Sequence, residues 1–519
     1  MRHIRPAVSG LIALFSLAMM LPALPVKPKP KPRPKSAVKQ KKPRQRAVKT
    51  QGTVTIGGKK ISYTATAGTI LLYGASHKPT ASMFYIAYTK NGVPAGQRPI
   101  TFAYNGGPGA ASALVDIGGF GPRRIEWPKP GQIRPELPPY TLVNNADSIL
   151  ASTDLVFVDA VGTGYSRILK SGTPKMFYGI TADGQAFTQF IQRYITQNGR
   201  WNSPKFLLGE SYGTTRSAVL ANDLVNKGVY LNGVILCSTV LQFPTLDFNP
   251  GNDLGYDLYL PSYAAAAWYH HRLQPEPATV QDAIQPAEAY AAGPYWQALY
   301  AGNRLSAAKK QAVAQRLSQL TGVPAQLWRQ ADLRISLPVF MRRLMGASGP
   351  MTGRYDDRFL TPELQPLMPF PGGSAAGASS TAIMGALTAT FDNYMTRVLH
   401  YSSPRIYTQL SFKVNGQWNM SYRSPLEGDS HYVNVAPALA RAMNNDPGMR
   451  LMMNNGYYDM ATPFFATQFT IAHMGLSAQR TRAVQWFYYP VGHMLYVNPR
   501  ALPALARNID AFIAGSYRH

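Results

Sequence analysis

The feature that most constrains the fold is a series of short apolar runs, each ending in glycine or a polar residue. Four of them precede residue 245 and two follow residue 445: RPITFAYNGG (98–107), TDLVFVDAVGTG (153–164), KFLLGESYG (205–213), GVILCSTV (233–240), MRLMMNNGYYD (449–459) and AVQWFYYPVGHM (483–494). Short apolar runs that are followed by helical stretches are typical of a mostly parallel sheet flanked by helices. The sequence therefore predicts an α/β fold.

Two earlier segments and one long middle segment depart from this pattern. VTIGGKKISYTAT (54–66) and ASMFYIAYTK (81–90) are alternating, β-branched and aromatic, which predicts antiparallel strands. The Ala-, Gln- and Leu-rich stretch over residues 274–320 predicts several helices without intervening strands. We therefore expect an α/β core over residues 51–245 and 446–519, interrupted by a mostly helical cap insertion over 246–445.

The first 50 residues have the character of a targeting segment followed by a linker. Arg2 and Arg5 precede an uncharged stretch over residues 6–26, so residues 1–26 are predicted to be an export signal or, if uncleaved, an N-terminal membrane anchor. Residues 27–50 are rich in Lys and Pro, which predicts a disordered, extended linker. It is either a spacer or a basic tail for electrostatic contact with an anionic membrane or wall surface. We expect an exported protein, periplasmic or extracellular.

Composition excludes several classes of protein and site. The chain has 519 residues, of which 45% are hydrophobic, enough for a large core. Its net charge is +27, but the tail has no aromatic side chain to stack on bases, so we expect no nucleic-acid partner. The single cysteine, Cys237, excludes an intrachain disulfide and a multi-cysteine metal site. We expect neither a metal nor a cofactor, and the oligomeric state stays open.

The sequence Gly209-Glu210-Ser211-Tyr212-Gly213 stands between a predicted strand and a predicted helix. This is the G-x-S-x-G pattern in the strand–turn–helix context that it requires. Small residues on both sides of the serine let its hydroxyl project above the edge of the sheet. A serine hydroxyl is a poor nucleophile unless a base lies within hydrogen-bond distance. Ser211 is therefore the candidate nucleophile, and the chain must supply a base.

Two late strands end in residues that can complete such a site. Asp459 follows the run at 450–453, and His493 follows the run at 486–491. A carboxylate after one strand can orient an imidazole after the next. The chain order Ser211, Asp459, His493 is that of the α/β-hydrolases. Asp446 and Asp510 are the alternatives for the orienting carboxylate.

A glycine-rich loop, Asn105-Gly106-Gly107-Pro108-Gly109, follows an early predicted strand. Glycine-rich loops in this position can turn backbone N–H groups toward a developing oxyanion. The alternative is an ordinary turn. The position of the loop, after a strand and upstream of the nucleophile, favours the functional interpretation.

Taken together, these motifs resemble the characteristic blocks of the serine carboxypeptidases. The resemblance runs from about residue 52 to the end of the chain, and its five blocks keep the order of the family: NGGPGAAS (105–112), DLVFVDAVGTGYS (154–166), GESYG (209–213), NGYYDMATP (455–463) and GHM (492–494). It implies an α/β-hydrolase fold with an inserted cap. Position by position, it implies that Ser211 is the nucleophile, His493 the base and Asp459 its orienter.

The same resemblance implies two further groups of residues. The backbone N–H groups of Gly107 and Tyr212 correspond to the oxyanion hole. Asn105 and Glu210 correspond to part of the network that binds the C-terminal carboxylate of the substrate.

This chain departs from the family in two ways. The family usually has a second glutamate before the Gly-Pro that follows the glycine-rich loop, and here Gly119 occupies that position. Arg123 and Arg124 come soon after and are an alternative source of charge for substrate binding. Eukaryotic members also have several disulfides, whereas this chain has only Cys237, so it resembles the cysteine-poor bacterial branch.

Three hypotheses from different classes follow. The first is a carboxypeptidase that cleaves peptide bonds near the C-terminus of peptide substrates through an acyl-enzyme. The second is an esterase or acyltransferase with the same Ser-Asp-His triad, which the missing glutamate favours. The third is a non-catalytic surface-binding protein, against which the complete set of catalytic motifs argues.

Overall fold

The computed structural model describes residues 43–127, 137–361, 377–424, 428–430 and 432–517. The predicted signal or anchor over residues 1–26 and most of the predicted linker lie outside these residues. Among the described helices, none combines the length and the apolar character needed to cross a bilayer.

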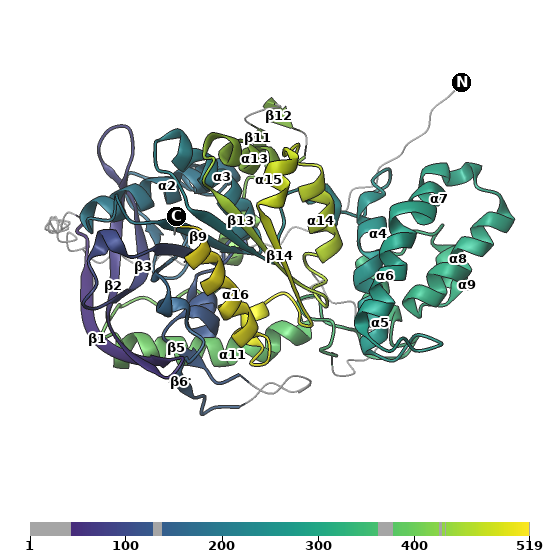
Figure 1. Ribbon diagram of the computed structural model, residues 1–519, viewed down its shortest axis with the longest axis horizontal. Helices are drawn as coiled ribbons and strands as arrows, with labels where there is room; N and C mark the ends of the chain where they lie inside the picture. The colour runs from purple at the N-terminus through teal and green to yellow at the C-terminus, as the bar shows by residue number, and fades with distance from the viewer. Residues whose placement is uncertain (1–42, 128–136, 362–376, 425–427, 431, 518–519) are drawn as a thin grey trace, which may run out of the picture. The chain divides into compact units, whose positions relative to one another are not determined.

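The core of the described chain is one mixed sheet (Figure 1). Its main path runs in the order β1-β2-β3-β7-β4-β9-β10-β13-β14, while the short strand β8 (Arg167–Ile168) pairs with β3. The strands on the path are β1 (Ala47–Ile56), β2 (Lys59–Tyr73), β3 (Pro79–Lys90), β4 (Ile100–Tyr104), β7 (Asp154–Val158), β9 (Lys205–Glu210), β10 (Gly233–Cys237), β13 (Arg450–Gly456) and β14 (Val484–Tyr489).

The sheet has an antiparallel part and a parallel part, as the sequence predicts. β1, β2, β3 and β7 pair antiparallel in succession. From β7 through β4, β9, β10 and β13 to β14, every neighbouring pair is parallel. The prediction of an α/β-hydrolase fold with a mostly parallel sheet is confirmed.

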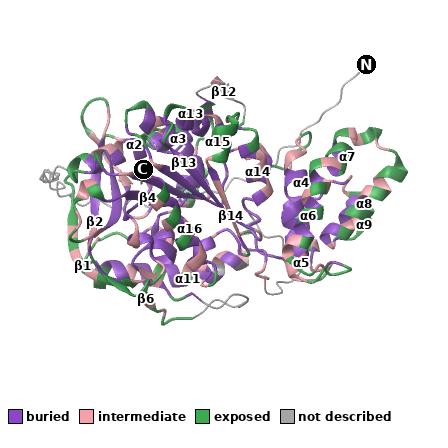
Figure 2. Ribbon diagram, viewed as in Figure 1, coloured by how far each residue is buried: buried purple, intermediate pink, exposed green. Residues whose placement is uncertain are grey.

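Helices cover both faces of the sheet, because buried strand residues alternate between two apolar clusters. In β9, Leu207 belongs to the cluster that also contains residues of α2 (Ile180–Gln197), α3 (Tyr212–Asn226) and α13 (Ala436–Asn445). Leu208 belongs to the opposite cluster, with residues of α11 (Gly377–Asn393) and α16 (Leu502–Gly515). Figure 2 shows the strands as the buried centre between these helices.

The cap is shorter than the sequence predicts. Its helices are α4 (Leu254–Leu258), α5 (Leu260–Tyr269), α6 (Val280–Tyr290), α7 (Trp296–Ala301), α8 (Ala307–Thr321), α9 (Ala325–Gln330) and α10 (Leu337–Arg343). They share an apolar cluster of their own, which extends from Tyr259 to Leu344 and includes Met460 of the core.

The prediction that the cap continues to residue 445 is wrong. The apolar faces of α11 and α13 pack on the two sides of the sheet, through residues such as Ile383 and Leu439. Both helices are rich in small and apolar residues, like the cap helices that precede them. Composition alone could not separate these two groups of helices, because the difference lies in the surface against which they pack.

The predicted boundary between linker and core, at residue 50, is also wrong. Arg46 donates from its backbone N–H to Thr69 Oγ1 (3.1 Å) and from its guanidinium to the Ser402 carbonyl (2.8 Å). β1 begins at Ala47 and pairs with β2 along its whole length. After Pro43 this segment has no further proline, so its backbone N–H groups are free to join a strand. The folded core therefore begins at about residue 44.

This boundary gives a matched pair of truncations. Removing residues 1–42 should leave the melting temperature of the core unchanged, whereas removing residues 1–50 should lower it. The longer deletion removes four residues of β1 and the contacts of Arg46 with Thr69 and Ser402. Thermal denaturation followed by circular dichroism measures the difference, and equal melting temperatures would contradict the new boundary.

A buried carboxyl group joins the loops at the end of β7 and β4. Asp159, which follows β7, accepts hydrogen bonds from the Ser112 backbone N–H (2.9 Å) and from the Tyr407 hydroxyl (2.8 Å) through Oδ1. Burial raises the pKa of Asp159 to about 6, although these hydrogen bonds favour the charged form. The folded protein therefore holds the proton of Asp159 more tightly than the unfolded chain does.

The raised pKa of Asp159 predicts a pH-dependent contribution to stability. The protonated group contributes fully below its ordinary pKa of 3.8, and this contribution is lost as the pH rises through about 6. The loss amounts to about 3 kcal/mol at most, since one pKa unit corresponds to about 1.4 kcal/mol. Asp159→Asn cannot ionise, so its melting temperature should rise relative to that of the wild type between pH 4 and pH 7. A constant difference across that range would contradict the prediction.

Candidate active site

Ser211 occupies a sharp turn between β9 and α3. Its backbone angles are φ 59° and ψ −130°, and α3 begins at the next residue. The positive φ costs energy for a non-glycine residue, which is typical of functional turns. A Cβ at Gly209 would lie 2.3 Å from the carbonyl oxygen of Gly213, so the turn leaves no room for a side chain there. The turn predicted from G-x-S-x-G therefore forms, with the serine at its apex.

The structure brings Asp459 and His493 into direct contact. Nδ1 of His493 lies 2.8 Å from Oδ2 of Asp459, and the carboxylate is fully buried. Asp459 also accepts hydrogen bonds from the backbone N–H groups of Ala461 (2.8 Å) and Thr462 (2.9 Å) and from the Thr462 hydroxyl (2.6 Å). These donors fix the orientation of the carboxylate that faces the imidazole.

Two opposing effects set the pKa of His493. Burial lowers it, but the charge and the hydrogen bond of Asp459, followed by the charge of Glu210, raise it above the ordinary value overall. This environment stabilises an imidazolium, the species that forms when a histidine takes a proton from a serine.

Thr462 is a functional candidate that the sequence reasoning missed. Its hydroxyl donates to Asp459 Oδ2 and lies 3.2 Å from His493 Nδ1. A local signal was present, because an aspartate whose side chain caps the residues two and three positions later is a common turn. The spacing Asp459-x-x-Thr462 could therefore have predicted this contact.

Glu210, Asn105 and Tyr496 form a buried polar network beside the imidazole. Oε1 of Glu210 lies 3.4 Å from Nε2 of His493. The Asn105 amide donates to Glu210 Oε2 (2.9 Å) and to the Tyr496 hydroxyl (3.0 Å). Burial raises the pKa of Glu210, against the opposing effect of His493 and Asn105. Glu210 is thus a carboxyl group that readily holds a proton, next to the base.

Tyr496 also explains the absence of a glutamate at position 119. A Cβ at Gly119 would lie 2.4 Å from the Cβ of Tyr496, so no side chain fits beside the tyrosine. Arg123 and Arg124 do not supply a charge to the network around Glu210. Arg123 interacts with Tyr63, and Arg124 donates to the Ile125 carbonyl. The Asn105 amide thus has one carboxyl partner, Glu210, and one hydroxyl partner, Tyr496.

The glycine-rich loop lies directly against the start of α3. A Cβ at Gly106 would lie 2.4 Å from the backbone nitrogen of Tyr212, so only glycine permits this approach. Gly107 has a φ of 102°, a conformation that favours glycine. The two residues predicted to form an oxyanion hole, Gly107 and Tyr212, therefore belong to loops that touch each other. Their role as oxyanion donors stays a prediction.

A segment after the cap, residues 354–358, holds the loops of Asp459 and His493 together. The Tyr355 carbonyl accepts from the His493 backbone N–H (2.6 Å), and the Arg354 carbonyl accepts from the Met460 N–H (3.1 Å). The ring of Tyr355 lies 5.2 Å from the imidazole of His493, centre to centre. No sequence motif marks this segment, because its contacts depend on how the cap returns to the core.

The alternative carboxylates lie elsewhere. Asp446 accepts a hydrogen bond from the Leu231 backbone N–H, and Asp510 accepts one from the Ser152 hydroxyl. Of the three candidates for the orienting carboxylate, Asp459 is the one that contacts His493.

Comparison with known families agrees with this arrangement. The model of the serine carboxypeptidase family matches residues 62–244, which include the glycine-rich loop and Ser211. The resemblance found in the motifs is confirmed over this part of the chain, and the match and the fold together support a serine hydrolase.

Solved structures match this chain at low sequence identity. A prohormone-processing carboxypeptidase from Saccharomyces cerevisiae matches with a TM-score of 0.56 and 14% identity, covering 87% of this chain and 92% of that chain. A proline iminopeptidase from Mycobacterium smegmatis matches with a TM-score of 0.34 and 13% identity, covering 90% and 98%. The bacterial brefeldin A esterase matches with a TM-score of 0.34 and 10% identity, covering 87% and 77%. A comparison with curated protein sequences finds no match.

The contacts around Asp459 give a graded set of expected effects on activity. Ser211→Ala and His493→Ala should lower kcat by about 10⁴- to 10⁶-fold, and Asp459→Ala somewhat less, because such residues act as a unit. Thr462→Val should lower kcat by about tenfold, the order expected for losing a hydrogen bond to a charged group. Thr462→Ser keeps the hydroxyl, so its kcat should stay close to that of the wild type. Steady-state kinetics measure these values, and near-full activity of Asp459→Ala would refute the choice of orienting residue.

Proposed function

We propose that this protein is an exported serine carboxypeptidase that hydrolyses peptide bonds near the C-terminus of peptides through an acyl-enzyme. The observation that carries this proposal is the position of His493 between two different carboxyl groups. Asp459 contacts Nδ1, while Glu210, whose pKa is raised, lies beside Nε2. The first carboxyl orients a base, and the second can share a proton with the carboxylate of a substrate.

In the proposed reaction, His493 Nε2 removes the proton of Ser211 as its hydroxyl oxygen attacks the scissile carbonyl carbon. The resulting oxyanion accepts hydrogen bonds from the N–H groups of Gly107 and Tyr212. The tetrahedral intermediate then collapses, and His493 gives the proton to the leaving amine, which departs as the C-terminal product. Water, activated by the same histidine, attacks the acyl-enzyme and releases the shortened peptide.

Selection of a free C-terminus would come from Glu210 and Asn105. Two carboxyl groups at hydrogen-bond distance cannot both be ionised at low cost, so one proton is shared between Glu210 and the substrate carboxylate. The Asn105 amide, which already donates to Glu210, keeps that side chain in place. The Tyr496 hydroxyl accepts a hydrogen bond from the same Asn105 amide nitrogen and supplies a neutral group in place of a second acid.

The chemistry of Ser211 also permits ester hydrolysis or acyl transfer, since an acyl-enzyme reacts with water or with another alcohol. Gly119 is the observation that favours this second candidate function, because the network at Glu210 then contains one carboxyl group instead of two. For the N-terminal region, we propose that residues 1–26 direct export and that the basic tail contacts an anionic membrane or wall polymer.

The experiment that tests the function compares three substrates across about pH 4 to 8: a peptide with a free C-terminus, its C-terminal amide, and a simple ester. The value of kcat/KM for the free-acid peptide should peak on the acid side of neutrality and fall as the shared proton is lost. The other two substrates should peak at higher pH. An enzyme that hydrolyses the ester but neither peptide would favour the esterase function.

Glu210→Gln should separate two effects of this carboxyl group. The first is binding of the substrate carboxylate, and the second is the raised pKa of His493. A neutral amide donates to the substrate carboxylate at any pH, so the alkaline fall for the free-acid peptide should flatten. The charge of Glu210 raises the pKa of His493, so its removal should move the acid limb of ester hydrolysis to lower pH. Unchanged profiles for both substrates would contradict the proposed role of Glu210.

A further inference from the structure

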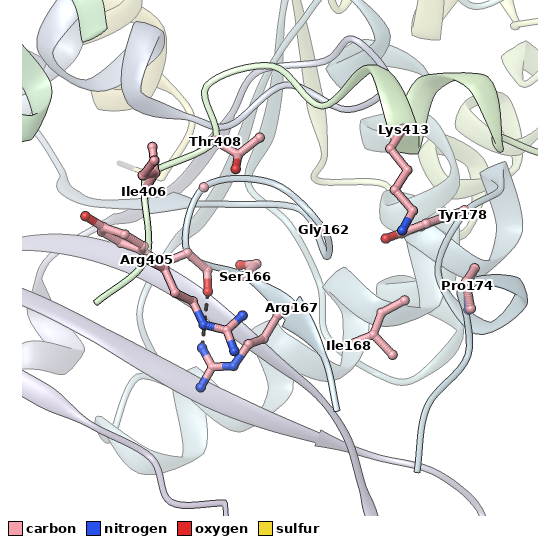
Figure 3. Close-up of a pocket in the computed structure, with 12 residues that line it drawn as sticks. Gly162, Ser166, Arg167, Ile168, Pro174, Tyr178, Arg405, Ile406, Thr408 and Lys413 are labelled. Carbon is pink, nitrogen blue, oxygen red and sulfur yellow. Dashed lines mark hydrogen bonds between the residues drawn. The ribbon is translucent and has the colours of Figure 1, made fainter. Parts of the chain in front are cut away.

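A cavity opens beside the loop that follows β7 (Figure 3). Its volume is about 550 Å³, and its walls come from three segments, residues 162–168, 174–178 and 405–413. Three cationic side chains line it, Arg167, Arg405 and Lys413, and no aspartate or glutamate does. We refer to this cavity as the cationic pocket.

The three cations have no counterion within the described part of the chain. None of them forms an ion pair there, and the one side-chain hydrogen bond among them joins Arg167 to the Tyr165 carbonyl at 3.5 Å. Burial, followed by the charge of Arg405, lowers the pKa of Arg167, so the two guanidinium groups repel each other. Crowded cations of this kind are stabilised by an anion, and guanidinium groups bind carboxylates through paired hydrogen bonds.

The pocket also has neutral donors. The hydroxyl groups of Thr408 and Tyr178 both belong to lining residues, and neither makes a hydrogen bond with another described residue. Ile406, which is 87% exposed, adds an apolar surface at the same wall. Charged, polar and apolar groups together suit the side chain of a peptide better than a small inorganic anion.

The strand order places the pocket with respect to Ser211. The segment 162–168 follows β7, the glycine-rich loop follows β4 and Ser211 follows β9. These three strands are neighbours in the sheet. Two strand spacings separate β7 from β9, which is about 10 Å. The lining segment 405–413 also contacts the glycine-rich loop directly, since the Ser411 N–H donates to the Gly109 carbonyl (2.8 Å).

The pocket and the imidazole lie on opposite sides of the nucleophile. Asp459 and His493 follow β13 and β14, which lie beyond β10 on the other side of β9. In the proposed reaction His493 protonates the leaving amine, so the leaving group lies on its side. The C-terminal carboxylate of the leaving group lies at Glu210, beside His493, and the acyl part extends from Ser211 toward β7, where the cationic pocket is. An extended peptide spans about 10 Å in three residues.

We propose that the cationic pocket is a subsite for the carboxylate of an aspartate or glutamate side chain, located two or three residues before the scissile bond. Arg405 and Lys413 bind the carboxylate at the entrance, and Arg167 binds it from the inner wall. The preferred substrates are therefore acidic peptides. This inference rests on the proposed peptidase function.

The kinetic test compares peptides that differ only by Glu or Gln at the second or at the third position before the scissile bond. At one of these positions the wild type should prefer Glu by about tenfold in kcat/KM, the order expected for a charge-assisted hydrogen bond. The double variant Arg405→Gln/Lys413→Gln should bring this ratio close to one. Lys309→Gln, an exposed cation on α8 of the cap, is the matched control and should keep the preference.

A binding measurement separates the failure of this inference from the failure of the proposed function. With Ser211→Ala protein, calorimetry should show tighter binding of the Glu peptide than of the Gln peptide, and the pocket double variant should abolish the difference. This result does not require turnover. Equal binding of both peptides by Ser211→Ala protein, or a Glu preference that survives in the double variant, would overturn the subsite, even if the enzyme hydrolyses peptides.

Discussion

The parallel pairing of the strands from β7 to β14 is the constraint on which the rest of the structure depends. Parallel strands must all end at the same edge of the sheet, so the residues that follow them meet there. Six strands contribute to that edge, and the loops after them contain the glycine-rich loop, Asp159, Ser211, Asp459 and His493. Residues up to about four hundred positions apart in the sequence therefore meet at the site, because the strands that precede them end at the same edge.

The edge of the sheet is also buried, which makes each acidic group there expensive to ionise. The molecule treats these groups in two ways. Asp459 accepts hydrogen bonds from two backbone N–H groups and from the Thr462 hydroxyl, and these donors fix the orientation of the carboxyl group that faces His493. At Glu210 and Asp159 burial outweighs the hydrogen bonds that these groups accept, and it raises the pKa of both. One carboxyl group of the site is thus fixed by its donors against the imidazole, and burial raises the pKa of the other two.

Features of the fold and of the site that depend on local sequence patterns could be predicted, whereas contacts between distant parts of the chain could not. The strand positions and the turn at Ser211 follow from local patterns, and the order of the motifs identified Asp459 and His493. The contact between Gly119 and Tyr496 could not be predicted, because it joins two loops that are distant in the chain. The end of the cap was missed for a similar reason, since α11 resembles a cap helix in composition and differs only in packing against the sheet.

Among the described residues, Asn105 donates to one carboxyl group, that of Glu210, and to one hydroxyl group, that of Tyr496. A pair of carboxyl groups can hold one proton between them over a wide pH range, because the first ionisation disfavours the second. Glu210 contacts no second carboxyl group among the described residues, although burial and then the charge of Asp459 raise its pKa, and the Tyr496 hydroxyl stays neutral because burial raises its pKa well above the ordinary value. The protonation of Glu210 therefore depends on burial and on the neighbouring His493. In this protein the groups that would bind the substrate carboxylate and the base that would cleave the peptide bond share one electrostatic environment, and neither can titrate without affecting the other.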